Sequence, residues 1–446
     1  MTTANERPNP VQDQLVLALR DLDFQRTRLR FLLGTDEHIP QEARVALAPT
    51  HLARLHRDLA RLGLEVEMVV VAGAGARARP PFSDDDYRAV GAQVVSEAEA
   101  AELPAFDLLH SLKEPTPYEA TLRGPFLRIG ALHLATKPPG LCAVVRARNV
   151  AAIFDGATVG SCSYLIHRGD RTPIVGSMSR FAGSVAARKA VAAVERNGLG
   201  KGRVVVVGGG IAGQSAIKEL RPIAAPLVVV EPWEPMHSRL QRFFAEQGLR
   251  DAEIVTRLGE DTLKDAIAVV FAHRSGARAA EKVCSIEQIR TLRKGAAISD
   301  IAIDQGGSIA HPGYEDRDDA VVAREKYLAL MGEDYSYYAE VNMPREEPHD
   351  ASLMHGDASL PYVTALLALL AHLGTTTALS RYVLSRDLKI YTDPSQVSEI
   401  GLLDAFVQDL RNGLQLAFVG DELRLTDPDI AKDPVLSGWI RGCAAR

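Results

Sequence analysis

The sequence predicts an α/β protein built on two mostly parallel sheets. Over residues 29–115, short apolar runs of strand length alternate with helical patterns, and such alternation is typical of parallel sheets with helical crossovers. Residues 201–231 form one strand–turn–helix–strand unit around a glycine-rich turn. The alternation then resumes and continues to about residue 303.

Composition limits the classes of protein. A chain of 446 residues allows two or three domains, and 46% apolar with 24% charged residues suits a globular fold with a sizeable core. The formal net charge of −6 gives no electrostatic reason to expect nucleic acid or an anionic membrane as a partner. The four cysteines lie far apart without a C-x-x-C pair, which indicates free thiols in a reducing compartment.

The ends of the chain carry no targeting signal that we recognise. The N-terminal stretch is polar, and the longest apolar run near the C-terminus, residues 362–373, is too short to span a bilayer. We therefore expect a cytoplasmic protein with no membrane partner.

The first part of the chain predicts an N-terminal extension, residues 1–28, followed by an α/β domain. The extension contains one amphipathic helical pattern over residues 11–22. The predicted elements that follow are strands at 30–33, 65–71 and 107–110, a strand and turn over 127–139, and helices at 50–62 and after Ser83. Ser83 is a good N-cap because acids fill the first turn behind it. Residues 177–179 are predicted to open a helix that runs to about Asn197 and leads into the glycine-rich turn.

The glycine-rich turn, residues 208–213, fits G-x-G-x-x-G and directly follows four valines that indicate a buried strand. Gly208 permits the tight turn, Gly210 lets a pyrophosphate approach the backbone, and Gly213 lets the next helix pack closely on the sheet. The helix N-terminus offers N–H groups to phosphates. The following strand ends at Glu231, whose carboxylate can accept hydrogen bonds from both ribose hydroxyls of an adenosine. Because it would repel a 2′-phosphate, we predict NAD as the cofactor.

The remaining pattern completes two domains. Beyond Glu231 we predict strands at 266–271 and 296–303, a helix around 286–292, a surface loop at 311–324, a helix from 360 to about 373 and a hairpin-like turn at 420–422. Residues 29–175 and 343–446 are predicted to form the substrate (catalytic) domain, and residues 176–342 the NAD-binding domain. The predicted fold is therefore two Rossmann-like domains with a cleft between them, the first discontinuous.

Nine segments together resemble the alanine dehydrogenase and nicotinamide nucleotide transhydrogenase (α-subunit) family. They occur in the family order over about residues 30–375, and D-x-A-x-D-Q-G-G with N-M-P is specific. The segments are EARVALAPTHLARL (42–55), AGAGARARPPFSDDDYRAVGAQVV (72–95), LKEPTP (112–117), LHLA (132–135), MSRFAG (178–183), VVGGGIAG (206–213), DIAIDQGG (300–307), VNMP (341–344) and SLPY (359–362).

The resemblance implies four catalytic residues. Arg44 falls at the family's substrate-carboxylate arginine and Lys113 at the lysine that binds the carboxylate or keto oxygen. His133 falls beside the reacting carbon, and Asp304 near nicotinamide and substrate. Arginine and lysine suit a carboxylate clamp, and histidine or aspartate can shuttle protons near neutral pH, while the dinucleotide does the redox step.

The resemblance also implies the cofactor site. Gly208, Gly210, Gly213 and Glu231 match the pyrophosphate and ribose positions, and Ser179, Asn342 and Met343 match positions close to the cofactor. No metal site is implied. Relatives are dimers or hexamers, so by analogy we expect a homo-oligomer.

Each catalytic candidate also has an ordinary structural interpretation. Arg44 would be an ion-pair arginine and Lys113 a solvated loop lysine. His133 would be a hydrogen-bonded core histidine, and Asp304 a helix or turn cap. Only their joint placement in family segments favours the catalytic interpretation.

Departures from the family pattern leave the substrate open. Arg180 stands at a family acid, Ser163 aligns roughly with another, and the charged segment Arg345–Glu347 replaces a small apolar run. His355 and Asp357 enter a segment that is threonine-rich in the family.

The sequence therefore predicts an NAD-dependent amino-acid dehydrogenase of the alanine dehydrogenase type, acting on an amino acid or keto acid larger or more polar than alanine or pyruvate. One alternative is an opine-type dehydrogenase that joins an amine to a keto acid, as in the more distantly similar saccharopine dehydrogenase and N-(carboxyethyl)ornithine synthase. The other is a non-catalytic or transhydrogenase-like NAD(H)-binding module.

Overall fold

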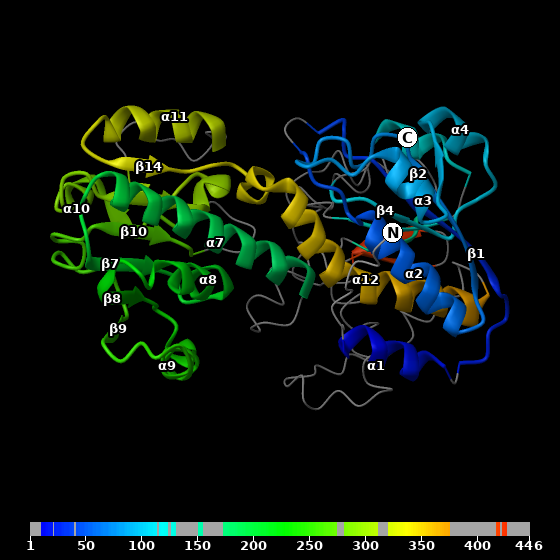
Figure 1. The fold of residues 1–446 in the computed structure, drawn as a ribbon, viewed down its shortest axis with the longest axis horizontal. Helices are drawn as coiled ribbons and strands as arrows, with labels where there is room; N and C mark the ends of the chain where they lie inside the picture. The colour runs from blue at the N-terminus through cyan, green and yellow to red at the C-terminus, as the bar shows by residue number, and fades with distance from the viewer. Residues whose placement is uncertain are drawn as a thin grey trace. The chain divides into compact units, whose positions relative to one another are not determined.

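A computed structural model gives the fold, and its described residues are 10–20, 22–39, 42–113, 116–123, 126–130, 150–154, 173–273, 281–310, 320–374, 416–419 and 422–425. The chain divides into two compact units, residues 1–175 with 347–446 and residues 176–346 (Figure 1). The chain returns to the first unit after residue 346 rather than 342, because the 3-10 helix η3 (Met343–Glu346) begins with a methionine that packs in the core of the second unit.

The first unit contains a parallel sheet with the order β3-β2-β1-β4-β5-β6. The strands are β1 (Arg28–Leu33), β2 (Glu65–Val71), β3 (Gln93–Val95), β4 (Leu108–His110), β5 (Phe126–Ile129) and β6 (Val150–Phe154). Each neighbouring pair runs parallel. The helices are α1 (Pro10–Leu19), α2 (Pro49–Arg61), α3 (Asp84–Ala89), α4 (Glu97–Glu102), the 3-10 helix η1 (Pro117–Thr121) and α12 (Pro348–Leu373).

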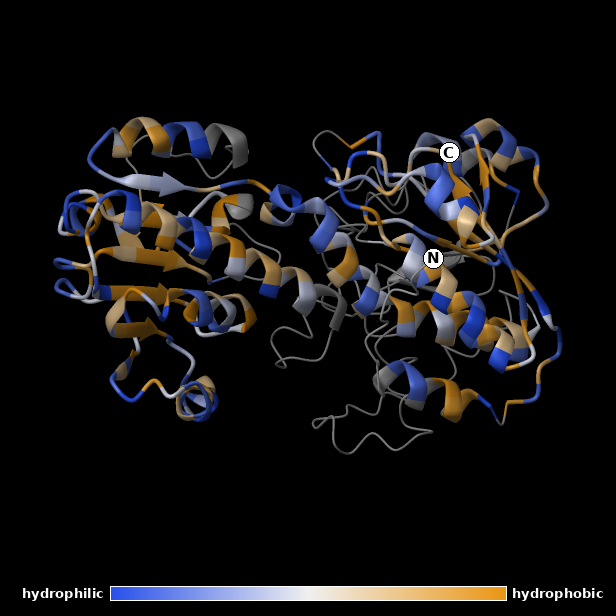
Figure 2. Cartoon of the chain, in the orientation of Figure 1, coloured by the Kyte–Doolittle hydropathy of each residue, from blue (hydrophilic) through white to orange (hydrophobic). Residues whose placement is uncertain are grey.

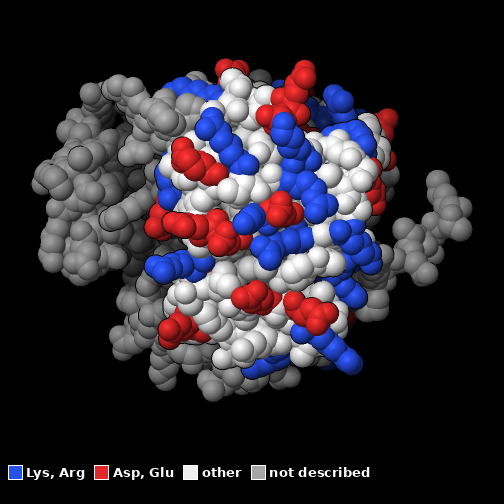
Figure 3. All heavy atoms as spheres, turned by 90° about the vertical axis from the view of Figure 1, so that its left-hand side faces the viewer, with Lys and Arg blue, Asp and Glu red and all other residues white. Residues whose placement is uncertain are grey.

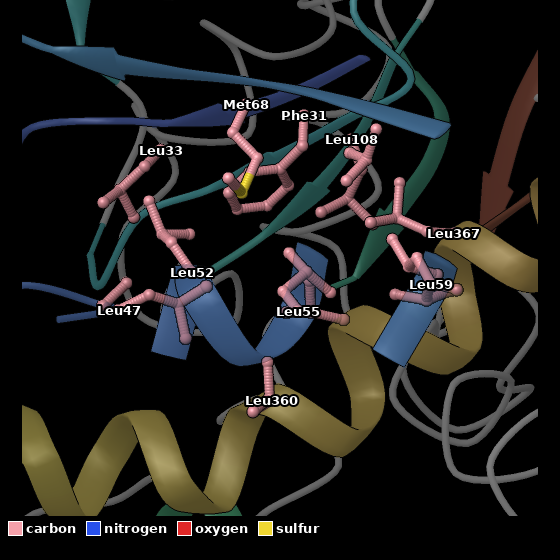
Figure 4. Packing of buried hydrophobic residues seen from close by; sticks show 14 of the residues in the cluster. Phe31, Leu33, Leu47, Leu52, Leu55, Leu59, Met68, Leu108, Leu360 and Leu367 are labelled. Atoms are coloured by element: carbon pink, nitrogen blue, oxygen red, sulfur yellow. The ribbon is translucent and has the colours of Figure 1, made fainter. Parts of the chain in front are cut away.

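Successive strand side chains point to opposite faces of the sheet. Each face packs in its own hydrophobic cluster, so both faces are buried. Phe31 and Leu33 of β1 face a core that includes the leucines of α2 and α12 (Figure 4). Leu32 between them packs on the other side, with Phe106 and Phe126 among others. The strands are accordingly hydrophobic on both faces, and the helices are mixed in hydropathy (Figure 2).

Residues 1–28 were predicted as an extension, but their helix α1 belongs to the first core. Val16 and Leu19 are buried in the same cluster as α2 and α12. The buried Gln12 amide donates hydrogen bonds to Asp58 at 2.9 Å and Thr364 at 2.8 Å. Helix α1 therefore contributes to the packing of α2 and α12.

Helix α12 begins at Pro348, twelve residues before the predicted start at Leu360. Proline is well suited to the first turn of a helix. Among the described helices, residues 348–372 are long and apolar enough to cross a membrane. However, 69% of the most apolar stretch of this helix is buried inside the protein. The packing of α12 on the first sheet accounts for this apolar composition.

The second unit contains a parallel sheet with the order β14-β12-β10-β7-β8-β9. Its strands are β7 (Gly202–Val207), β8 (Ala224–Val230), β9 (Ala252–Val255), β10 (Ala268–Phe271), β12 (Ala297–Asp300) and β14 (Ser336–Tyr338). Its helices are α7 (Pro173–Arg196), α8 (Ile211–Leu220), α9 (Glu234–Gln247), α10 (Ile286–Ile289) and α11 (Ala320–Met331), with a 3-10 helix η2 (Ile301–Gln305) and a short parallel pair, β11 (Cys284–Ser285) and β13 (Ile309–Ala310).

The two faces of the second sheet also form separate cores. Val204 and Val206 of β7 pack with residues of α7, α8 and α9. Val205 and Val207 pack with residues of α10 and α11. Numbered by chain order, both sheets have the strand order 3-2-1-4-5-6 of the doubly wound dinucleotide-binding fold.

Three predicted boundaries are wrong. Helix α7 begins at Pro173 rather than at residues 177–179. The strand predicted at 296–303 ends at Asp300, because the Asp300 carboxylate accepts the Ala302 N–H and starts η2. The predicted loop at 311–324 ends in helix α11, which buries Tyr327 and Met331; residues 311–319 lie outside the described part. The hairpin prediction is confirmed by the antiparallel strands β15 (Leu416–Val419) and β16 (Glu422–Leu425).

Candidate functional site

Each sheet reverses its strand order once, between β1 and β4 in the first unit and between β7 and β10 in the second. Connections diverge to opposite faces at such a switch point, so a crevice forms outside the carboxyl ends of the two strands. The loops after β1 and β4 carry Arg44 and Lys113, and the loop after β7 carries the glycine-rich turn. Arg44, Lys113 and the glycine-rich turn therefore lie at the topological binding position of their own sheet.

The glycine-rich turn needs glycine for steric reasons. Gly208 has φ +100°, and a Cβ there would lie 2.8 Å from the His273 nitrogen after β10. A Cβ on Gly213 would lie 1.9 Å from the Gly208 oxygen, so only glycine lets α8 approach the turn this closely. Gly210 is different, because a Cβ there would meet no described atom within 4 Å.

Helix α8 starts at Gly210 without a side-chain cap. The N–H groups of its first turn therefore remain available to a ligand, and the positive end of the helix favours an anion. The open space beside Gly210 is on the ligand side of the turn in the dinucleotide motif. These residues fit a dinucleotide pyrophosphate.

Glu231 follows β8 and is 8% exposed. One carboxylate oxygen accepts the Gly209 N–H at 2.8 Å, and the other accepts the Trp233 N–H at 2.9 Å. Two backbone donors thus fix the carboxylate beside the turn, and each oxygen retains a second lone pair for another donor. This geometry suits recognition of vicinal ribose hydroxyls.

Three further cofactor candidates are Ser179 on α7, Asn342 directly before η3, and Met343 on η3. Ser179 is half-buried on α7, one turn before Gly183, where a Cβ would lie 2.1 Å from the Ala212 oxygen. Asn342 has a left-handed backbone, φ +59°, which asparagine tolerates better than most residues. Met343 is buried in the core with the alanines of α7. Its packing gives it a structural role, and its closeness to a cofactor stays a prediction.

Asp304 lies in η2, and its side chain is outside the described part of the chain. The loop that carries it is organised by Asp300, which accepts hydrogen bonds from Ser308 N–H at 2.8 Å, Ser308 Oγ at 2.8 Å and Ala302 N–H at 3.0 Å. Burial raises the pKa of Asp300, against these hydrogen bonds and the charge of His273. Lys282 donates to the carbonyls of Gly306 and Gly307 at 2.6 and 2.7 Å. Asp300 and Lys282 therefore fix the backbone of the D-x-A-x-D-Q-G-G segment through hydrogen bonds.

Arg44 is 6% exposed and forms a bidentate ion pair with Glu42. Its Nε donates to Glu42 Oε1 and its Nη2 to Oε2, both at 2.7 Å. Burial raises the pKa of Glu42, but the charge and hydrogen bonds of Arg44, with the charge of Lys113, outweigh burial and hold it at about 2. Glu42 is therefore ionised and fixes the guanidinium plane.

Lys113 lies at the end of the loop that follows β4. The Asp36 carboxylate, in the loop after β1, accepts the N–H groups of Leu112 at 2.8 Å and Lys113 at 2.9 Å. Because the Lys113 charge acts on the Glu42 carboxyl, the structure brings Arg44 and Lys113 into one electrostatic neighbourhood. His133, the third candidate of this unit, lies outside the described residues.

Three histidines pack near this clamp. The rings of His110, at the end of β4, and His355, on α12, lie 5.8 Å apart between centroids. His51 of α2 accepts the Ala48 N–H at 3.1 Å on Nδ1 and lies 3.3 Å from Asp357 through Nε2. The described residues contain no group of three or more histidine, cysteine or acidic side chains arranged to hold a metal ion.

Sequence reasoning missed Glu42, Asp36 and Asp300 as partners of the predicted residues. Glu42 lies two residues before Arg44 in the same matched segment. Asp36 follows β1 by three residues and Asp300 ends β12, so the sequence alone could have marked all three acids as candidates. The hydrogen-bond partners of these acids could not be predicted in the same way. Asp36, for example, accepts hydrogen bonds from residues 76 and 77 positions away in the chain.

Surface charge gives no sign of a polyanion site on the face seen in Figure 3. Basic and acidic side chains are interspersed over the described surface there. This distribution agrees with the formal net charge of −6.

The fold and its two switch-point loops define a two-domain dinucleotide-binding α/β protein. The family models "Alanine dehydrogenase/PNT, N-terminal domain" and "Alanine dehydrogenase/PNT, C-terminal domain" match residues 35–182 and 178–392. The chain belongs to the alanine dehydrogenase/PNT family, and the predicted family and α/β fold class are confirmed.

Similar curated proteins are alanine dehydrogenases. That of Staphylococcus saprophyticus is 27% identical over 355 residues, covering 75% of this chain and 87% of the relative. That of Mycolicibacterium smegmatis is 27% identical over 343 residues, covering 73% and 84%. Alanine dehydrogenase 2 of Staphylococcus aureus is 27% identical over 388 residues, covering 83% and 95%.

Two solved structures share the fold. An L-alanine dehydrogenase has a TM-score of 0.58 at 22% identity, covering 86% of this chain and 100% of that one. A transhydrogenase from Sinorhizobium meliloti has a TM-score of 0.57 at 18% identity, covering 75% and 92%.

Proposed function

We propose that this protein is an NAD-dependent amino-acid dehydrogenase of the alanine dehydrogenase type. The reaction is hydride transfer between the nicotinamide and the carbon that bears nitrogen in an amino acid or its imine. The observation that carries the proposal is the buried Arg44–Glu42 pair at the switch point of the first sheet, whose loop also holds the Lys113 backbone through Asp36. The dinucleotide turn of the second unit and the names of the curated relatives support it.

Arg44 and Lys113 bind the substrate carboxylate. Glu42 holds the guanidinium by two hydrogen bonds, so less orientational freedom is lost when the substrate binds. Asp36 fixes the backbone that carries Lys113. Charge–charge attraction is stronger in this buried site than in water, which favours a compact anion such as a carboxylate.

The second unit binds the cofactor through the first turn of α8 and Glu231. The glycines let the pyrophosphate approach the backbone N–H groups, and the fixed carboxylate accepts hydrogen bonds from the adenosine ribose. When bound, NAD supplies the hydride acceptor. His133 and Asp304 move protons on the substrate amine and on the attacking water, and Asp300 with Lys282 positions the segment that bears Asp304.

The charged segment Arg345–Glu347 contributes little to the argument for a polar substrate. Arg345 donates to Glu340 at 3.0 Å, and Glu346 lies 3.9 Å from Lys189. These ion pairs within the second unit account for two of the three charges. Cytoplasmic location and homo-oligomerisation stay predictions.

The proposal is tested by NADH oxidation, followed by absorbance, with a panel of keto acids. Each keto acid is supplied with ammonia and then with a primary amine such as lysine or ornithine. We expect turnover with ammonia alone. Turnover only with a primary amine would assign an opine-type dehydrogenase, and NADH binding without any turnover would assign a non-catalytic or transhydrogenase-like module.

The role of His133 has its own test. His133→Ala should lower kcat by about 100-fold or more, because a positioned acid/base typically contributes 10²–10⁴-fold. The affinity for NADH, measured by its fluorescence, should change less than about twofold, since the cofactor residues lie in the other unit. Equal turnover in the variant and the unmodified protein would exclude this role.

A further inference from the structure

His355 is a buried histidine that the proposed mechanism does not use. It is 7% exposed on α12, and neither ring nitrogen has a hydrogen-bond partner among the described residues. A neutral imidazole carries one donor and one acceptor. Buried polar groups in native proteins nearly always have partners, so an imidazole with both nitrogens unmet indicates a partner that the described residues do not supply.

The neighbouring histidines do not share this property. His110 donates from Nδ1 to the Ile129 carbonyl at 3.2 Å, and its Nε2 lies 3.4 Å from Ser359 Oγ. Both nitrogens of His51 have partners, as described above. A Cβ on Gly356 would lie 2.3 Å from the His51 ring, so that ring packs directly against the α12 backbone. Of these three neighbouring histidines, His355 is the one with both ring nitrogens unmet among the described residues.

The position of His355 connects it to the carboxylate clamp. Burial lowers the pKa of His355 well below its usual value, and the charges of His110, Arg44 and His51 lower it further, while Glu42 opposes them. The imidazole is therefore neutral at physiological pH. The loop that carries Arg44 is bonded directly to α12, because Ser352 Oγ, one turn before His355, accepts the Val45 N–H at 2.9 Å.

We propose that His355 hydrogen-bonds the substrate side chain and selects an amino acid whose side chain is polar but uncharged, with a hydroxyl or carboxamide group. This inference rests on the proposed function and makes its substrate class specific. A hydroxyl or carboxamide offers both a donor and an acceptor, which match the two unmet ring nitrogens. A methyl group offers neither.

Charge balance argues against an ionised side chain. The Arg44 guanidinium is paired with the Glu42 carboxylate, and the α-ammonium and α-carboxylate of an amino acid add no net charge. A further charge beside His355 would therefore be buried without a partner, which is costly.

The test compares pyruvate with 3-hydroxypyruvate, each with ammonia and NADH. The two differ by one hydroxyl on the side chain. We expect the unmodified protein to prefer 3-hydroxypyruvate by about 10- to 100-fold in kcat/KM, the usual cost of leaving one buried neutral group without its hydrogen bond. His355→Leu should bring this ratio to within about threefold of unity, mainly through KM. His355→Asn, which keeps a donor and an acceptor, should retain part of the preference.

His349→Leu is the matched control. His349 is another histidine of α12, but it stacks on Phe82 at 4.3 Å and donates to the Pro80 carbonyl at 2.8 Å. The control should keep the preference of the unmodified protein. A ratio that is the same in His355→Leu and in the unmodified protein, or an original preference for pyruvate, would overturn the inference.

Calorimetric binding separates this inference from the proposed function. Both keto acids are titrated into the unmodified protein and into His355→Leu in the presence of NAD⁺, which permits no turnover of a keto acid. Tighter binding of 3-hydroxypyruvate that His355→Leu abolishes would support the inference even if no turnover is found and the proposed function fails. Binding of neither keto acid would overturn the inference.

Discussion

The two units have the same strand order and the same switch point, but they place opposite kinds of group there. The first unit presents charged side chains, with the Arg44 guanidinium held by Glu42 and the Lys113 backbone held by Asp36. The second presents bare backbone at glycines, with one carboxylate tied to the turn. Topology therefore fixes where a ligand binds, and loop composition decides which ligand it is.

The units also differ in how their cores are assembled. The second is built from one continuous segment, residues 176–346. The first needs α12, whose leucines pack against α2 and β1 from more than 290 residues away in the chain. Because α12 also carries His355 and supports the Arg44 loop through Ser352, the carboxylate clamp depends on the return of the chain.

The largest expected effect lies in the glycine-rich turn of the second unit, residues 208–213. Gly213→Ala places a Cβ 1.9 Å from the Gly208 oxygen. The helix or the turn must move, so we expect a loss of more than about 3 kcal/mol in the unfolding free energy, at the upper end for overpacking. NADH binding should be lost as well. Denaturant unfolding and NADH fluorescence measure the two effects.

Gly210→Ala is the matched variant in the same turn. Its Cβ would meet no described protein atom, and the φ of −70° suits any residue. We expect a change of less than about 0.5 kcal/mol in stability, but about 10-fold weaker NADH binding, because the methyl group occupies the space of the pyrophosphate. Equal losses of stability in the two variants would contradict the steric assignment.

The Arg44–Glu42 pair of the first unit should show a pH-dependent stability. The folded pKa of Glu42, about 2, lies below its ordinary value of 4.5, so ionised Glu42 stabilises the fold above pH 4.5 and this contribution fades as pH falls toward 2. Glu42→Gln should therefore cost about 3 kcal/mol at pH 7 and clearly less at pH 3.5. Urea unfolding at both pH values measures the difference.

Glu65→Gln provides the contrast for this ion-pair prediction. Glu65 pairs with Arg28 at 3.0 Å, but 73% and 85% of the two side chains are exposed. Its loss should cost less than about 0.5 kcal/mol at either pH. A cost for Glu42→Gln that does not change with pH would mean that packing rather than charge dominates its role.

The one carboxylate of the second site should control the choice of dinucleotide. Glu231→Gln replaces an oxygen that accepts a backbone N–H by a donor. We expect NADH binding to weaken about 10-fold, equivalent to the loss of one or two hydrogen bonds, and discrimination against NADPH to fall. Titrations of both nucleotides test this, with Glu253→Gln on the exposed side of β9 as the control. Unchanged discrimination would exclude Glu231 from the ribose site.

These comparisons also explain what the sequence could predict. The glycines were predictable because each is required by contacts within a short segment, and β2 and the Ser83 cap follow from local pattern alone. The start of α12 was not, because polar residues such as Ser352 and His355 interrupt its apolar pattern and are buried only through contacts with the distant first sheet. The bidentate pair of Arg44 and Glu42 could be predicted only in part. The sequence identified the cation, but its pairing with a carboxylate depends on the folded loop.

Apart from the control variants, the smallest expected effects come from helix caps, which the two units share. Ser83 Oγ accepts the Asp86 N–H and Ser285 Oγ accepts the Gln288 N–H, both at 3.2 Å. Replacing either serine by alanine should cost about 1 kcal/mol, the usual value of an N-cap. Amide hydrogen exchange should rise around α3 in Ser83→Ala and around α10 in Ser285→Ala, and NADH affinity should stay within about twofold in both. Since neither cap touches a switch-point loop, a large change in NADH affinity would show that binding depends on the whole scaffold of a unit and not on the loop chemistry that distinguishes the two.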